Sequence, residues 1–202
     1  GGQLRKRTDE QLLEAYALTR EEHPDVRLVF GGGETLFDYR EYRDRFEARA
    51  AELGIHPIIL GSVDDAALPA LVAEARALAF VSTKEGFGLA AMEALAACTP
   101  VVARDLPVIR EVFGDAVLYG SAPSEIAARL DAVLRGRASI DTAAGVELAR
   151  AHTWDRAARA HEEFDARVPL ASARCPRRHS RRSSLSPRGA QSTRPAPCDG
   201  PG

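Results

Sequence analysis

The feature that most constrains the fold is a repeated alternation, over residues 1–168, of short apolar runs with longer amphipathic segments. Because these runs are short and carry few polar residues, they predict strands that are covered on both faces. Strands of this kind, alternating with helices, are typical of a parallel sheet. We therefore predict an α/β fold with a Rossmann-like parallel sheet and helices on both faces. The predicted strands are 26–30, 57–60, 78–81, 100–103 and 116–119.

Capping and breaker residues mark the helices between these strands. Residues 8–11 (TDEQ) form a capping box, which predicts that the first helix begins at Thr8, and Pro24 ends it. Gly54 ends the second helix, and Pro107 suits the first turn of a later one. The later helices are predicted at 38–53, 68–77, 89–97, 107–112, 126–134, 141–150 and 154–167.

Residues 169–202 differ from the rest in composition and charge. They contain seven arginines, six prolines, six serines and one acid, so they carry +6 while the preceding residues carry −8. A segment of this kind predicts a disordered tail separate from the domain at 1–168. An arginine-rich arm for RNA or an acidic partner is the alternative, but no aromatic residue is interleaved for base stacking. We therefore expect no nucleic-acid partner.

Several classes of protein and site are disfavoured. No apolar run approaches the ~20 residues of a membrane span, so no transmembrane segment is expected. No signal segment opens the chain, and we expect a cytoplasmic location. The glycine-rich stretch 31–36 has Leu36 where a dinucleotide fingerprint needs glycine. The three cysteines and five histidines lack the spacing of a disulfide framework or a metal site, so no metal is expected.

The loop after the third predicted strand carries the most informative motif. Residues 82–89 read STKEGFGL and lead directly into a predicted helix. Gly86 and Gly88 allow the backbone to approach a ligand closely, and the free N–H groups of a helix N-terminus favour a diphosphate. Ligands of doubly wound sheets bind at the carboxyl ends of the strands, where this loop lies. The motif therefore predicts an anion-binding loop.

Two glutamates flank the start of that helix. Glu85 precedes it, and Glu93 lies about two turns after Glu85. Carboxylates accept hydrogen bonds from hydroxyl groups, so one suits the sugar and the other the ribose of a sugar nucleotide. Either acid alone is better explained as an ordinary surface or hydrogen-bonded glutamate. The combination with the glycine loop favours a sugar-nucleotide site.

Further segments extend this motif along the chain. EGFGLAAMEALA at 85–96, with seven residues between its two flanking glutamates, is followed by TPVV at 99–102 and PVIREV at 107–112. Together these segments resemble the retaining glycosyltransferases of family 4. That family has the GT-B fold, two Rossmann-like domains with the active site between them. The resemblance implies that residues 1–168 are the donor-binding C-terminal domain. Weaker matches are RKR at 5–7, LVFG at 28–31, LGSV at 60–63 and AHTW at 151–154.

The resemblance assigns roles to individual residues. Glu85 corresponds to the acid near the donor sugar and Lys6 to the lysine that neutralises the donor phosphates, so these two are the implied catalytic residues. Glu93 corresponds to the acid that holds the ribose hydroxyls. The other implied donor-binding residues are Gly2, Arg5, Val63, Phe87, Gly88 and Leu89.

Some positions depart from the family pattern or fit it ambiguously. Family members often have an arginine directly after the first glycine, whereas Gln3 follows Gly2, so Arg5 is the candidate replacement for that phosphate contact. Cys98 stands where a glycine usually precedes TPVV, and we expect a small buried residue without a redox role. Val63 corresponds to a residue of the base pocket, although an apolar residue there equally suits the core.

The resemblance implies transfer of a sugar from a nucleotide diphosphate sugar to an acceptor hydroxyl, with retention at the anomeric carbon. It implies no metal and no cofactor, because the nucleotide sugar is the substrate, and it leaves the acceptor unknown. Two alternatives stay open, a GT-B-type sugar-nucleotide epimerase and a non-catalytic nucleotide-binding half-protein.

The resemblance covers only one of the two GT-B domains. The N-terminal acceptor domain, and the strand that leads into the first glycine pair, have no counterpart in the sequence. We therefore expect the chain to be inactive without that domain. We also expect a sheet that is incomplete in its middle, with exposed strand edges and marginal stability. Peripheral membrane contact in a full protein stays open.

Overall fold

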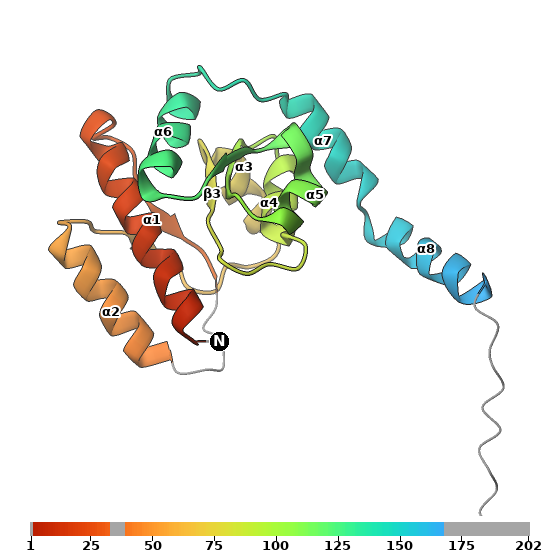
Figure 1. Cartoon of the computed structure of the whole chain (residues 1–202), viewed down its shortest axis with the longest axis horizontal. Helices are drawn as coiled ribbons and strands as arrows, with labels where there is room; N and C mark the ends of the chain where they lie inside the picture. The colour runs from red at the N-terminus through yellow and green to blue at the C-terminus, as the bar shows by residue number, and fades with distance from the viewer. Residues whose placement is uncertain (1, 33–38, 168–202) are drawn as a thin grey trace, which may run out of the picture. The chain divides into compact units, whose positions relative to one another are not determined.

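The computed structural model describes residues 2–32 and 39–167, with side chains for 10–32 and 43–167, and it has the predicted alternation of strands and helices (Figure 1). The strands are β1 Val29–Phe30, β2 Ile58–Ile59, β3 Leu78–Phe80, β4 Val101–Arg104 and β5 Leu118–Gly120. The helices are α1 Gly2–Glu22, α2 Tyr39–Glu52, α3 Leu68–Glu74, α4 Leu89–Ala96, α5 Pro107–Phe113, a 3-10 turn η1 Gly114–Ala116, α6 Pro123–Leu134, α7 Thr142–Ala151 and α8 Trp154–Arg167.

The chain divides into two compact units, residues 1–162 and 163–202. The first holds all the strands and every helix up to α8, which crosses into the second. Of the second unit the structure describes the end of α8, where Arg167 lies 3.8 Å from Glu163. The predicted disordered tail, 169–202, lies outside the described residues. No helix in the described part of the chain has the length and apolar character needed to span a membrane.

Helices cover both faces of the main sheet, as predicted. β3, β4 and β5 pair in parallel, with Val102 aligned to Ala79 and to Leu118. All four residues of β4 are buried, and their side chains alternate between the faces. Val101 and Ala103 belong to a core cluster with α4 and α5, whereas Val102 packs in a cluster with α1 and α6. The α/β prediction is confirmed.

The strands form two separate sheets. β1 and β2 pair in parallel with each other, and β3, β4 and β5 form the second sheet. Within the described residues, one edge of β1 and one edge of β3 therefore lack a strand partner. The described residues thus form two small parallel sheets in place of the single sheet that the sequence predicts. Val29 and Ile59 are large apolar residues that stay exposed on the smaller sheet.

Helix α1 connects the cores of the two sheets. Leu12 and Ala15 of α1 share one cluster with Val81, which follows β3, and Phe30 of β1 packs against the same cluster. Leu13, one residue further round the helix, belongs to a cluster with Ala50 of α2. Figure 1 shows α1 lying between α2 and α6. The helix links the two sheets, because it buries apolar side chains from both.

The start of α1 differs from the prediction. The capping box at Thr8 predicts a helix N-terminus there, but α1 already begins at Gly2 and continues through Thr8. Residues 3–7 (QLRKR) are good helix formers without a breaker, so the helix extends across the box. The box identifies a residue type that caps well, but nothing before it stops the helix.

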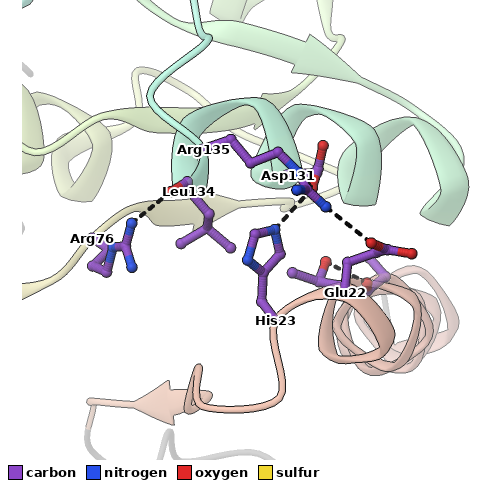
Figure 2. A network of polar contacts seen from close by, with 8 residues as sticks. Glu22, His23, Arg76, Asp131, Leu134 and Arg135 are labelled. Carbon is purple, nitrogen blue, oxygen red and sulfur yellow. Dashed lines mark hydrogen bonds and ion pairs between the residues drawn. The ribbon is translucent and has the colours of Figure 1, made fainter.

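The C-terminal ends of α1 and α6 are joined by a polar network (Figure 2). Asp131 accepts from Arg135 Nε at 2.6 Å and lies 2.8 Å from His23 Nε2, and Arg135 Nη2 donates to Glu22 at 2.9 Å. Nearby, Arg76 donates to the carbonyl oxygen of Leu134 at 2.6 Å. The hydrogen bond from Arg135 and then that with His23 lower the pKa of Asp131.

We expect this network to make stability depend on pH. A carboxylate whose pKa is lower in the folded state stabilises that state above its unfolded pKa, about 3.9, and the stabilisation is lost as the pH falls through the lower folded value. Asp131→Asn should therefore unfold at lower urea than the wild type at pH 7, and the difference should shrink at pH 3. Urea midpoints at both pH values measure this. An equal difference at the two pH values would show that the ionised Asp131 carboxylate is not the source of this stabilisation.

Cys98 adopts a left-handed backbone conformation directly after α4. Its φ is 60°, the one positive value among non-glycine residues of the described ranges, and its side chain is exposed. The expectation of a buried cysteine is therefore wrong. The helix ends at Ala96 with Ala97 as C-cap, so Cys98 occupies the position where glycine most often reverses the chain.

Glycine at this position should stabilise the protein. A left-handed conformation costs an L-residue roughly 1–2 kcal/mol, of which the greater unfolded-state freedom of glycine offsets about half. We expect Cys98→Gly to raise the free energy of unfolding by about 0.5–1 kcal/mol in urea titrations under reducing conditions. Cys98→Ala, which keeps the strain and removes the thiol, should not; an equal gain from alanine would assign the effect to the thiol.

Candidate functional site

The candidate loop begins at the carboxyl end of β3 and ends at the first turn of α4. Val81 is buried at its start, and the Ser82 hydroxyl donates to the carbonyl oxygen of Lys84 at 3.2 Å. β3 is parallel to β4 and β5, so their carboxyl ends lie at the same edge of the sheet. The loop therefore lies where the sequence analysis places it.

Gly88 is required at the end of this loop for two reasons. Its φ is 95°, in the left-handed region, and a Cβ there would lie 3.0 Å from the Phe113 ring and 3.2 Å from the Phe80 ring. Gly86 has open space where its Cβ would be, and no positive φ. The two glycines differ, and the need for Gly88 arises from the protein core rather than from ligand approach alone.

Helix α4 presents an uncapped N-terminus at the end of the loop. Gly88 is the N-cap and offers no side-chain hydrogen bond, so the first N–H groups of the helix are left for another acceptor. Ala91, Met92, Ala94 and Leu95 are buried, which orients the helix, whereas Leu89 and Glu93 are exposed. Leu89 and Glu93 are four residues apart and therefore share the exposed face of α4.

The two glutamates of the motif are available to a ligand. Glu85 is half-buried and Glu93 is exposed, and in the described part of the chain neither carboxylate makes a hydrogen bond or ion pair. A carboxylate at the sheet edge without a protein partner can accept hydrogen bonds from the hydroxyl groups of a ligand. Glu85 precedes the α4 N-terminus and Glu93 lies in the second turn of that helix, so both belong to the segment that the sequence motif marks.

Phe87 contacts a residue that sequence reasoning missed as part of the site. Its ring centroid lies 5.7 Å from that of His152, at an interplanar angle of 51°. His152 follows α7, and its Nδ1 donates to the carbonyl oxygen of Leu148 at 2.9 Å. His152 lies within the AHTW segment at 151–154, one of the weaker family matches, and that segment is the signal that points to this position.

Val63 lies beside the segments that follow β1 and β2. Its Cγ2 is 3.3 Å from the point where a Cβ on Gly31 would be, so a side chain at Gly31 would press on it. The N–H of Gly32 donates to the carbonyl oxygen of Gly61 at 2.8 Å, and this hydrogen bond joins the segments that follow β1 and β2. Val63 is half-buried, so it fits both the predicted base-pocket role and a core role.

Three predicted site residues belong to the first turns of α1. Gly2, Arg5 and Lys6 all lie on the helix by their backbone, but the side chains of Arg5 and Lys6 fall outside the described ones. Their predicted phosphate contacts therefore stay predictions. No group of three or more metal-ligating side chains occurs in the part of the chain with described side chains.

A family model described as "Glycosyl transferases group 1" matches residues 3–152. The chain belongs to the group 1 glycosyl transferases. It is 33% identical to the O-antigen chain mannosyltransferase B of Escherichia coli over 156 residues, which cover 71% of this chain and 38% of that protein. It is 34% identical over 153 residues to the phosphatidyl-myo-inositol mannosyltransferase of Mycobacterium leprae, with the same coverages of 71% and 38%.

This group 1 glycosyl transferase chain also shares its fold with a solved relative. The crystal structure of Anabaena HepE in complex with UDP and glucose superposes with a TM-score of 0.66 at 19% sequence identity. The superposition covers 79% of this chain and 46% of HepE. The chain thus spans less than half the length of the relatives and of the solved structure, in agreement with a resemblance to one GT-B domain.

Proposed function

We propose that this chain is the donor-binding half of a retaining mannosyltransferase of family 4. In the proposed reaction a mannosyl group passes from a nucleoside diphosphate sugar to an acceptor hydroxyl. The observation that carries the proposal is that Glu85 and Glu93, before and within α4, have no partner among the described residues, next to a helix N-terminus without a side-chain cap. Membership in the group 1 family supports the same reaction class, and the two relatives named above are mannosyltransferases.

The proposed mechanism is mainly electrostatic. The bond between the anomeric carbon and the diphosphate breaks, and the diphosphate leaves with the bonding electrons. The acceptor oxygen bonds to the same face of the sugar while its O–H bond breaks, and the proton passes to an oxygen of the leaving diphosphate. Charge develops on the leaving diphosphate, where the α4 N–H groups and the positive side chain of Lys6 would stabilise it. Glu85 would orient the sugar and stabilise the positive anomeric centre, and Glu93 would accept from the ribose hydroxyls.

Protein groups supply the stabilising charge in this mechanism, so we propose that no metal or cofactor takes part. The acceptor would be held by the additional parts that full-length relatives possess, because this chain spans 38% of each named relative. We therefore infer that residues 1–168 bind the donor and contribute its half of the active site.

Binding titrations test the proposal directly. The chain is titrated with GDP-mannose, UDP-glucose and ADP-glucose by calorimetry, with and without EDTA. We expect saturable binding of at least one sugar nucleotide, unchanged by the chelator. No binding of any donor, or binding that EDTA abolishes, would contradict the proposed function or its metal-free chemistry.

A further inference from the structure

Arg104 is a buried cation at the carboxyl edge of the main sheet. It is the last residue of β4, 8% exposed, and it follows three fully buried apolar residues. Burial lowers its pKa, and within the described residues no carboxylate pairs with it. Taking a guanidinium out of water without a counter-charge is unfavourable, so its neutral partners must hold it closely.

Three different elements accept hydrogen bonds from this one guanidinium. Nε donates to the carbonyl oxygen of Val81 at 2.8 Å, and Nη1 donates to that of Ser121 at 3.1 Å. Nη2 donates to the side-chain oxygen of Gln11 on α1. The acceptors thus come from the residue after β3, the residue after β5 and helix α1. A planar guanidinium with several fixed donors can reach acceptors in three directions, whereas a lysine ammonium on a flexible stem cannot hold them in this geometry.

Two of these acceptors belong to the segments that carry the proposed catalytic residues. Val81 immediately precedes the loop 82–88, and Glu85 is four residues further along. Gln11 lies five residues after Lys6 on the same helix, about 7–8 Å along its axis. Arg104 therefore connects two segments through a single side chain: α1, the helix that carries Lys6, and the start of the loop 82–88, which carries Glu85 and is called the Glu85 loop below.

We propose that Arg104 is a positioning residue, which fixes the Glu85 loop relative to α1 so that both engage one donor molecule. The proposal rests on the proposed function, because it concerns the same sugar-nucleotide site. Misplacement of a binding group by about 1 Å is enough to weaken a ligand contact severely. Because no carboxylate among the described residues pairs with Arg104, its charge adds a positive potential at the sheet edge, which favours an anionic ligand.

A purely structural role is the competing explanation, and Arg135 provides a matched control. Arg135, the C-cap of α6, also ties that helix to α1, but through Glu22 at the C-terminal end of α1. Glu22 lies about 16 Å along α1 from Gln11. Arg104→Gln and Arg135→Gln remove the same charge and each remove contacts of α1, but only Arg104→Gln releases the loop.

The experiment compares wild type, Arg104→Lys, Arg104→Gln and Arg135→Gln at a temperature well below the unfolding transition of each. We expect the Kd for the best sugar nucleotide to rise at least about tenfold in both Arg104 variants and to stay unchanged in Arg135→Gln. An unchanged Kd in Arg104→Lys would overturn the proposal, because the planar arrangement of guanidinium donors would then be unnecessary for binding. An equal rise in Arg135→Gln would overturn it in favour of general destabilisation.

Amide hydrogen exchange separates failure of this proposal from failure of the proposed function. Residues 82–88 should exchange faster in Arg104→Lys than in the wild type, with no nucleotide present, while Arg135→Gln leaves that loop unchanged. If the wild type binds no sugar nucleotide, the proposed function fails. The hydrogen-exchange measurement, which needs no nucleotide, still tests whether Arg104 positions the loop. Unchanged exchange of the loop in Arg104→Lys would contradict the positioning role whatever the chain binds.

Discussion

Glu93→Ala is expected to weaken binding of the sugar nucleotide by about 10- to 100-fold, since one hydrogen bond to a charged group contributes roughly 1.5–3 kcal/mol. Glu93 is exposed on α4 and makes no hydrogen bond or ion pair with the described residues, so its loss removes no internal contact. The unfolding midpoint should therefore stay nearly constant. Calorimetric titration with the donor that binds best measures the change.

Glu74→Ala is the matched control for this prediction. Glu74 is an exposed glutamate at the end of α3, and it also lacks a partner among the described side chains. Both substitutions lower the negative charge of the chain by the same amount, so Glu74→Ala controls for the change in charge. We expect Glu74→Ala to leave the Kd unchanged. If Glu93→Ala binds the donor as the wild type does, Glu93 does not hold the ribose.

Gly88→Ala is expected to lower the free energy of unfolding by about 2–5 kcal/mol. A left-handed φ of 95° disfavours any L-residue, and a methyl group 3.0 Å from the Phe113 ring forces the core apart. A loss of this size is a large fraction of the roughly 5–15 kcal/mol that stabilises a typical domain. Urea and thermal unfolding followed by circular dichroism measure it, with a Tm fall of roughly 2–4 °C per kcal/mol.

Gly86→Ala separates this effect from a general sensitivity of the loop. Gly86 lies two residues earlier, has open space at its Cβ position and has no positive φ. Its substitution should change the unfolding free energy by less than about 0.5 kcal/mol. If the two alanine variants unfold together, the contact between Gly88 and Phe113 does not limit stability.

The strand pattern is predictable from the sequence because burial on both faces needs a continuous apolar run. The runs at 78–81 and 100–103 become β3 and β4 within one or two residues, and their parallel pairing is confirmed. Helix ends are less predictable, because capping is a local preference that the neighbouring residues override. At Thr8 the preceding helix formers prevail, and α1 begins six residues earlier, at Gly2.

The candidate site is predictable where a short motif carries it. Glu85 and Glu93 flank the α4 N-terminus as their spacing indicates, and Gly88 is its N-cap. Arg104 is not predictable in this way, since its acceptors come from three elements that are distant in the chain. His152 is likewise distant in sequence from Phe87 and meets it only through the packing of α7 on α4.

The sequence by itself determined the fold class, the order of the elements, the loop that presents Glu85 and the helix that presents Glu93. These properties depend on periodicity, glycine placement and spacing within a single segment, which are local in the chain. The tertiary structure alone decided that the strands separate into two sheets, that α1 buries residues from both, and that Arg104 ties α1 to the Glu85 loop. These depend on contacts between distant segments, which form only when burial and hydrogen bonding are satisfied together.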